Sequence, residues 1–288
     1  QVIDVAAIGA DLYACTIGGV GRFREGAWQT EGLPAGPTYS VIAGPDGAPW
    51  IAGSSGILTI GPDGEWATQQ VGQGEKLARQ SSIERWGRLG LDAQGQIWAG
   101  HRWGGGLGVR RTDGAWERLT TTSGGIPGNA PTAVASDAAG TLWVGFGNGL
   151  YRRIGEEWQA VPLPEELAKC RFVIALEPDA QGGIWAAVTG DPGAGGAVHL
   201  NAAGEATVYT PANSPLPSTR VRDVLVTSVG DVWFASDMGV ARLGADGEWE
   251  AITSLTSGLG CNIVLGLDEG PDGSIWFATA RGVSRYTP

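Results

Sequence analysis

Long apolar runs are missing from this sequence. No stretch reaches the roughly 18 apolar residues that a transmembrane helix needs, so we expect no membrane insertion. Methionine occurs once, as Met238, and the chain begins at Gln1. We therefore expect a processed or trimmed part of a longer polypeptide, explained by a removed export signal or by a boundary chosen for expression. A periplasmic or extracellular location is the resulting expectation.

Residues that usually carry chemistry are also scarce. The three cysteines, Cys15, Cys170 and Cys261, cannot all pair within one chain, and no C-x-x-C spacing indicates structural zinc. The sequence contains no H-E-x-x-H, phosphate-binding loop, G-x-S-x-G or calcium-loop motif. We expect no cofactor and no bound metal, and we assign no catalytic residue. Catalysis stays open as an alternative, although we favour a protein that is not an enzyme.

Positive charge is in short supply. Nineteen lysines and arginines face 30 aspartates and glutamates, which gives a net charge of −11. A strongly acidic chain is repelled by phosphate backbones and by anionic lipid surfaces. We therefore expect no nucleic acid partner.

Glycine and tryptophan, by contrast, are abundant, with 49 and 13 residues. The tryptophans mark a repeat. In each copy a turn is followed by a short apolar run that carries one aromatic residue. These residues lie 37, 48, 45, 42, 48 and 43 positions apart: Tyr13, Trp50, Trp98, Trp143, Trp185, Trp233 and Trp276. A second tryptophan follows in most copies, as Trp28, Trp66, Trp116, Trp158 and Trp249, while Val208 or Tyr209 takes its place in the fifth. A repeat of this length is typical of propellers and other arrays.

Each copy contains four short apolar runs separated by Asp-Gly, Asn-Gly or Gly-Pro-Asp-Gly turns, which close tight hairpins. Four strands cannot bury both faces alone, whereas copies stacked around a ring can. We predict an all-β, seven-bladed β-propeller of four-stranded antiparallel blades in a single domain. The expected blades cover residues 1–32, 33–72, 73–122, 123–164, 165–212, 213–255 and 256–288.

The last blade should be incomplete. After Tyr286 only two residues remain for a fourth strand, and residues 2–8 are needed as the inner strand of blade 1. In all blades, the aligned aromatic residues should lie between neighbouring sheets as core side chains rather than stack on a ligand.

Three segments resemble the two-component regulator propeller repeat. They are "LPSTRVRDVLVTSVGDVWFASDMGVARLGADGEWEAI", "GIPGNAPTAVASDAAGTLWVGFGNGLYRR" and "GLGCNIVLGLDEGPDGSIWFATARGVSRY". Blade 1 matches this pattern least well. The resemblance implies either the exported sensor part of a bacterial signalling protein or a stand-alone binding propeller. A more distant similarity to streptogramin lyase implies a histidine base with metal-binding glutamates, and no matching set is found, so that activity is not transferred. His199 is interpreted as an ordinary strand residue.

A propeller of this type has two faces. We call the face formed by the loops between strands 1 and 2 and between strands 3 and 4 of each blade the turn face. The connection face carries the loops between strands 2 and 3 and the links between blades. Its loops vary in length, with expansions at "GHRWGGGLG" and "VTGDPGAGGA", and expanded loops on one face often mark a binding surface.

Arginines and two tryptophans outside the aligned positions fall on this face. The predicted ligand-binding residues are Arg85, Trp86, His101, Arg102, Trp103, Arg171, Asp191, Arg220, Asp237 and Arg281. Guanidinium groups offer bidentate hydrogen bonds to carboxylate, sulfate or phosphate, and an exposed ring beside arginine suits a sugar. Local packing of the two tryptophans and solvation of single arginines remain open alternatives.

Three functions are compatible with these residues. The favoured one is a non-catalytic propeller that binds an anionic small molecule or a glycan. The first alternative is a platform for a protein partner, and the second is a metal-dependent lyase of the streptogramin lyase type.

Overall fold

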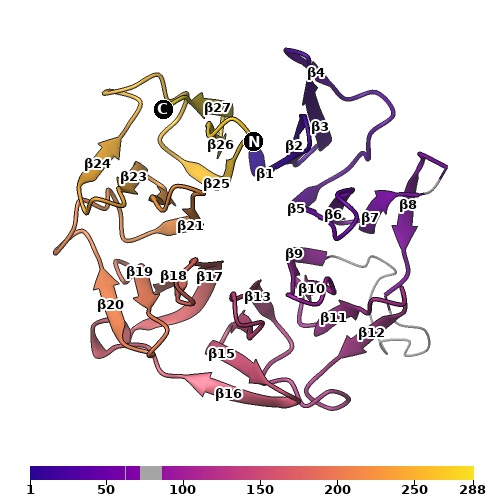
Figure 1. Ribbon diagram of the computed structural model, residues 1–288, viewed down its shortest axis with the longest axis horizontal. Helices are drawn as coiled ribbons and strands as arrows, with labels where there is room; N and C mark the ends of the chain where they lie inside the picture. Colours follow the sequence, from indigo (N-terminus) through magenta and orange to yellow (C-terminus); the bar gives the residue numbers. More distant parts are fainter. Residues whose placement is uncertain (62, 72–85) are drawn as a thin grey trace.

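The computed structural model describes residues 1–61, 63–71 and 86–288. In this part of the chain 27 strands form seven antiparallel sheets that follow one another around a ring, as Figure 1 shows. This confirms the predicted seven-bladed propeller. One short 3-10 helix, Glu165–Leu167, interrupts the strands, and no helix among the described residues is long and apolar enough to cross a membrane.

Each blade is a simple meander from the centre of the ring outwards. The first four sheets are β1 (Val2–Ile8), β2 (Asp11–Thr16), β3 (Gly19–Arg24) and β4 (Ala27–Gln29); β5 (Thr38–Ala43), β6 (Pro49–Gly53), β7 (Gly56–Ile60) and β8 (Trp66–Gln69); β9 (Trp86–Leu91), β10 (Ile97–His101), β11 (Leu107–Arg110) and β12 (Trp116–Leu119); and β13 (Pro131–Ser136), β14 (Leu142–Phe146), β15 (Gly149–Ile154) and β16 (Glu157–Val161).

The remaining three sheets are β17 (Cys170–Pro178), β18 (Ile184–Gly190), β19 (Gly195–Leu200) and β20 (Ala206–Tyr209); β21 (Val221–Val226), β22 (Val232–Ser236), β23 (Gly239–Leu243) and β24 (Trp249–Ile252); and β25 (Val264–Glu269), β26 (Ile275–Thr279) and β27 (Gly282–Tyr286). The last sheet has three strands and β1 is the inner strand of the first, so both predictions about ring closure are confirmed.

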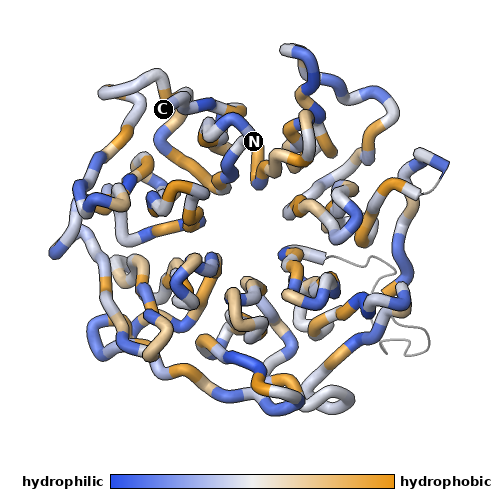
Figure 2. The backbone as a smooth tube through the Cα atoms, in the orientation of Figure 1, coloured by the Kyte–Doolittle hydropathy of each residue, from blue (hydrophilic) through white to orange (hydrophobic). Residues whose placement is uncertain are grey.

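The core lies between blades. Each hydrophobic cluster joins two neighbouring sheets, for example Trp50 of blade 2 with Trp86 and Leu89 of blade 3. Six of the seven aligned aromatic residues are buried and Trp276 is half-buried, as expected for core residues. Figure 2 shows the result along the chain, with apolar segments in the inner part of each blade and hydrophilic ones towards the periphery. Burial between sheets thus holds the ring together.

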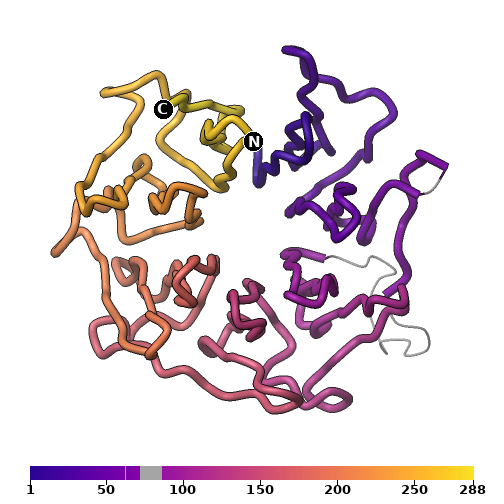
Figure 3. The backbone as a smooth tube through the Cα atoms, in the orientation of Figure 1, coloured from indigo at the N-terminus to yellow at the C-terminus, as the bar shows by residue number. Residues whose placement is uncertain are grey.

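The ring closes where the two ends of the chain meet. Figure 3 shows the N-terminal and C-terminal segments in neighbouring blades. Val2, Val5 and Leu12 of blade 1 pack against Ala278 of blade 7, and the backbone N–H of Ala7 donates to Oδ2 of Asp268. Closure therefore buries apolar side chains between two neighbouring sheets, as the other interfaces do.

Candidate functional site

The inner strands have an irregularity at the same place near the connection face. In six of them the register shifts across one unpaired residue, between Val2 and Asp4, Thr38 and Ser40, Pro131 and Ala133, Val173 and Ala175, Val221 and Asp223, and Val264 and Gly266. In the third blade the corresponding shift lies between the pairs Leu89–Ala99 and Trp86–His101. Such bulges redirect side chains and are common beside binding sites. Here they surround the mouth of the central channel.

Arg102 reaches this mouth from the loop between β10 and β11. Its guanidinium carbon lies 4.1 Å from the centre of the Tyr39 ring, and Tyr39 is the unpaired residue of the β5 bulge. Gly87 makes room for this path, because a Cβ there would lie 2.5 Å from Cγ of Arg102. The stacking positions an exposed guanidinium group across two blades.

His101 organises the loop that presents Arg102 and Trp103. Its Nδ1 accepts the backbone N–H groups of Gly105 (3.1 Å) and Trp103 (3.3 Å), so a neutral ring carries its proton on Nε2. The buried His101 ring meets that of Trp86 edge-on, with 5.3 Å between the ring centres. The indole of Trp103 is 70% exposed on the connection face.

The structure corrects one sequence expectation. Trp86 does not present an exposed ring: it is 0% exposed and packs in the cluster between blades 2 and 3, beneath the guanidinium group of Arg118. Its place outside the aligned aromatic positions suggested a loop residue, but Trp86 is the first residue of β9. Of the two tryptophans outside the aligned positions, Trp103 alone is available to a ligand.

A second group of charged side chains lies on blade 6. Arg222, the unpaired residue of the β21 bulge, donates through Nε and Nη2 to both oxygens of Asp237, at 2.7 and 3.0 Å. Arg220 lies 3.4 Å from the same carboxylate. Arg222 is absent from the predicted site residues. It lies next to Asp223 in the inner strand β21. Both carboxylate oxygens of Asp237 thus accept hydrogen bonds from arginine.

Three further predicted residues form no ion pair with these two groups. Arg171, Asp191 and Arg281 are exposed on blades 5 and 7, and none forms an ion pair with another described residue. Arg85 lies outside the described residues. The connection face therefore brings Arg102 and Trp103 together in one loop and Arg220 and Asp237 in another group, and the ligand-binding role of the whole set stays a prediction.

Four carboxylates in the central channel are missing from the predicted site. Asp4, Glu177, Asp223 and Asp268 line a cavity of about 280 Å³ together with Arg88. Three of them accept a backbone N–H of the next blade: Asp4 from Val41 (3.0 Å), Asp223 from Leu267 (2.9 Å) and Asp268 from Ala7. They tie inner strands that share no backbone ladder. An acid inside a mostly apolar inner strand, as Asp4 in "VIDVAAI" and Asp223 in "VRDVLV", is the signal that could have found them.

Burial in the channel raises the pKa values of these four carboxyl groups. Burial, together with the nearby carboxylates of Asp223 and Asp268, raises the pKa of Glu177 to about 8. Burial likewise raises the pKa values of Asp223 and Asp268 to about 7 each, and raises the pKa of Asp4, whereas the charge of Arg88 lowers the pKa values of Asp4 and Asp223. Throughout residues 1–61, 63–71 and 86–288, no three His, Cys, Asp or Glu side chains are grouped so that they could hold a metal ion.

The turn face holds one histidine–carboxylate pair. Nε2 of His199 lies 2.6 Å from Oδ2 of Asp179, and the His199 ring stacks on Trp185 at 4.4 Å. His199 pairs with Trp185 across the strands as Arg242 pairs with Trp233, and Arg242 contacts Asp231 in the same way. The repeat therefore explains His199 as a blade-stabilising residue, in agreement with its interpretation as an ordinary strand residue.

Several solved structures have the same architecture over nearly the whole of this chain. The extracellular domain of the hybrid two-component system BT3049 from B. thetaiotaomicron matches with a TM-score of 0.80 and 17% identity, over 100% of this chain and 39% of that chain. The chain has the fold of this extracellular domain. A streptogramin B lyase matches with a TM-score of 0.76 and 16% identity, over 99% of this chain and 92% of the lyase. PorZ, a surface component of the type-IX secretion system of Porphyromonas gingivalis, matches with a TM-score of 0.72 and 15% identity, over 99% and 46%.

These likenesses confirm, at the level of the fold, the resemblance to two-component regulator propellers and to streptogramin lyase. Identities of this size show the fold alone. This chain also spans about two fifths of the extracellular domains it matches, 38% for BT4673 and 39% for BT3049. No protein-family model matches the sequence, and no curated protein matches it.

Proposed function

We propose that this chain is the ligand-binding propeller of an exported sensor or capture protein, and that its connection face binds an anionic small molecule or an acidic glycan. The observation that supports this most directly is Arg102, held over Tyr39 at the channel mouth and followed in the same loop by Trp103, which is exposed. An aromatic plate next to a guanidinium group suits the ring and the carboxylate or sulfate of an acidic sugar. The structural likeness to extracellular domains of hybrid two-component systems supports the sensor role.

The surroundings of Arg102 favour an anion despite the net charge of the chain. Arg171, Arg220 and Arg281 are exposed on the same face, and Arg88 lies in the channel below it. Positive groups around a concave, weakly polarisable site focus the potential locally. The acids that make the chain negative lie largely in turns on the opposite face, for example Asp113 and Asp246.

The test is calorimetry with a panel of acidic sugars and organic anions. Replacing Arg102 or Arg281 by alanine should weaken binding by about 1–3 kcal/mol each, since each substitution removes a charge-assisted hydrogen bond. Binding should also weaken as salt rises, because counterions screen exposed charges. Arg111→Ala is the matched control, since Arg111 pairs with Glu117 on the turn face and should not affect binding. Binding that ignores salt and both substitutions would place the site elsewhere.

A protein partner is the second candidate. Among the described residues, six large apolar side chains are exposed on the connection face: Ile17, Trp103, Phe172, Met238, Leu255 and Ile263. Apolar side chains next to arginine are enriched in the centres of protein interfaces. If no anion binds in calorimetry, and Met238→Asp and Phe172→Asp disrupt a complex purified with the protein from its native host, the interaction platform is the better description.

A further inference from the structure

The central channel holds more acids than bases. Four inner strands, β1, β17, β21 and β25, each contribute one carboxylate to its cavity of about 280 Å³, whereas Arg88 of β9 is the single basic residue among the described residues that line it. Four ionised carboxylates beside one arginine would leave three negative charges uncompensated. Like charges in one cavity oppose ionisation, so some of these acids keep a proton at neutral pH.

Three of the acids change charge in the range where cells and their surroundings differ in pH. Burial raises the pKa of Glu177 to about 8 and the pKa values of Asp223 and Asp268 to about 7 each. All three are half-buried rather than sealed, so they can exchange protons with solvent. The channel therefore gains negative charge as pH rises through this range.

The other ionisable groups around the channel do not cancel this change. Burial and the charge of Asp4 raise the pKa of the Cys15 thiol well above its usual value, so the thiol stays neutral. Both oxygens of Glu269 accept hydrogen bonds from Ser228, at 2.7 Å. The inner strands β5 and β13 carry no aspartate, glutamate, histidine, lysine or arginine.

One inner strand joins the channel to the mouth beneath Arg102. Tyr39, which lies 4.1 Å from the Arg102 guanidinium carbon, belongs to β5. Two residues further along this strand, the backbone N–H of Val41 donates to Oδ2 of Asp4 at 3.0 Å. The ring that supports the proposed anion-binding arginine is therefore tied to a channel acid within three residues of chain.

Blade 6 connects the channel and the mouth in the same way. Arg222, whose guanidinium group binds Asp237 at the mouth, directly precedes Asp223 in β21. Asp223 in turn accepts the backbone N–H of Leu267, at 2.9 Å. Consecutive Cα atoms are about 3.8 Å apart, less than the roughly 8 Å over which charges act in physiological salt. Charge in the channel is thus close enough to affect an anion at the mouth.

We propose, building on the anion site proposed above, that the channel acids bind protons together with the anion at the mouth. An anion beside Arg102 makes negative charge in the channel less favourable, so the protein takes up protons from solvent as the anion binds. Ionised channel acids repel the anion by the same amount, because such coupling is reciprocal. The protein then holds its ligand in mildly acidic surroundings and releases it as pH rises.

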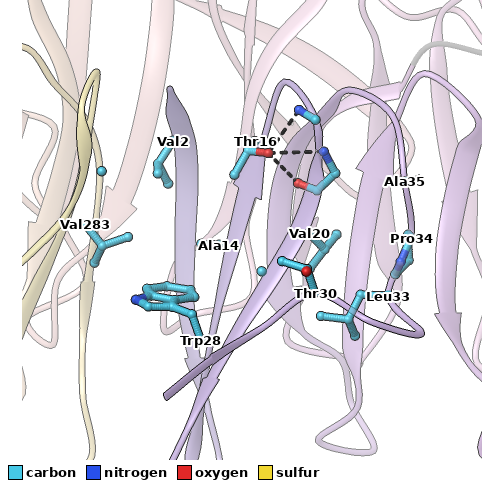
Figure 4. A pocket seen from close by; sticks show the side chains of 14 residues that line it. Val2, Ala14, Thr16, Val20, Trp28, Thr30, Leu33, Pro34, Ala35 and Val283 are labelled. Carbon is cyan, nitrogen blue, oxygen red and sulfur yellow. Dashed lines mark hydrogen bonds between the residues drawn. The ribbon is translucent and has the colours of Figure 1, made fainter. Parts of the chain in front are cut away.

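An uncharged cavity elsewhere does not compete for an anion. It measures about 490 Å³ and lies between blades 7 and 1, where Figure 4 shows Val2, Trp28 and Val283 around it. Among the described residues, no charged side chain lines it. An anion would lose its hydration there without gaining a partner, so binding of an anionic probe reports on the charged mouth.

Calorimetry with glucuronate and with inorganic sulfate tests the coupling, because neither probe changes its charge between pH 6 and pH 8.5. The dissociation constant should rise about tenfold across this range, a usual size for coupled sites. At pH 7.5, titrations in buffers of different ionisation enthalpy should show uptake of a fraction of a proton for each bound anion. Constant affinity without proton uptake overturns the coupling and leaves the anion site standing. No binding of either probe at any pH overturns both.

Glu177→Gln identifies the groups that take up the protons. Glutamine has nearly the same shape and no charge, so this variant should bind both probes about twofold to threefold more tightly than the wild type at pH 8.5 and equally well at pH 6. Asp268→Asn keeps an acceptor oxygen and should act in the same direction. A variant that only damaged the fold would bind more weakly at both pH values.

Two comparisons separate the channel from other titrating groups. Glu248→Gln makes the same chemical change at an exposed position on the turn face and should keep the wild-type pH profile. Histidines also titrate near neutral pH, and His101 belongs to the loop that presents Arg102. An effect caused by His101 would persist in Glu177→Gln and in Asp268→Asn. An unchanged pH profile in both variants therefore overturns the proposal.

Discussion

Asp92 shows how one turn residue serves both a hairpin and the core. Its Oδ1 accepts the backbone N–H groups of Gln94 and Gln96, and its Oδ2 accepts the indole N–H of Trp98 at 2.7 Å. Asp137 holds Trp143 in the same way, at 2.9 Å. The aspartates of these turns are therefore more than loop-closing residues, because they satisfy a buried donor of the central tryptophan.

Replacing Asp92 by alanine should lower the free energy of unfolding by about 2–3 kcal/mol. The substitution leaves the buried indole N–H of Trp98 without an acceptor and also releases the turn. Urea denaturation measures the effect. Asp113→Ala removes a comparable turn bond, to Ala115, at an exposed site and should cost less than about 1 kcal/mol. Equal losses in the two variants would contradict this role of Asp92.

At the scale of single elements, the loop between β10 and β11 depends on its glycines. Gly106 has φ +89°, and a Cβ there would lie 2.2 Å from the backbone oxygen of Leu119. Gly104, two residues earlier, has φ +76° and no atom within 4 Å of the Cβ position. The same loop thus contains a glycine required by close approach and another required by backbone conformation alone.

Gly106→Ala should destabilise the protein by about 3 kcal/mol, because backbone strain of roughly 1–2 kcal/mol adds to a clash with a neighbouring strand. Gly104→Ala should cost only the strain, about 1 kcal/mol. Thermal denaturation followed by circular dichroism compares the two. A larger loss in Gly104→Ala than in Gly106→Ala would show that the loop lies differently against β12.

At the scale of the whole molecule, the central channel brings together acids from blades 1, 5, 6 and 7. The raised pKa of Glu177, about 8 against its usual 4.5, means that the folded protein holds this proton more tightly than the unfolded chain does. The stability contributed by the protonated form is therefore present at low pH and is lost as pH rises from about 4.5 to about 8. The raised pKa values of Asp223 and Asp268 act in the same direction.

We expect the free energy of unfolding to fall between pH 5.5 and pH 8.5 by an amount on the order of 1–3 kcal/mol. Glu177→Gln should reduce this fall, since it removes one of the three titrating groups. Glu166→Gln, at an exposed position, is the control and should leave the pH profile unchanged. Urea denaturation at a series of pH values gives the profile. A fall of the same size in Glu177→Gln would show that the channel acids do not cause it.

The sequence by itself determined the architecture. Aligned aromatic residues, Asp-Gly turns and alternating apolar runs depend on short-range chemistry that recurs in every blade, so seven blades and a three-stranded last blade were predictable. The sequence also indicated that the aligned tryptophans are core side chains and that His199 is an ordinary strand residue. It did not show which side chains each of them contacts.

The tertiary structure alone decided which polar residues meet. Glu177, Asp223 and Asp268 come from separate blades, and their contact depends on the curvature of the ring rather than on spacing in the chain. The burial of Trp86 and the stacking of Arg102 on Tyr39 could not be predicted from the sequence for the same reason, because each depends on contacts with a neighbouring blade. Repeats specify a blade through local contacts, whereas a channel and its mouth exist only once all blades are in place.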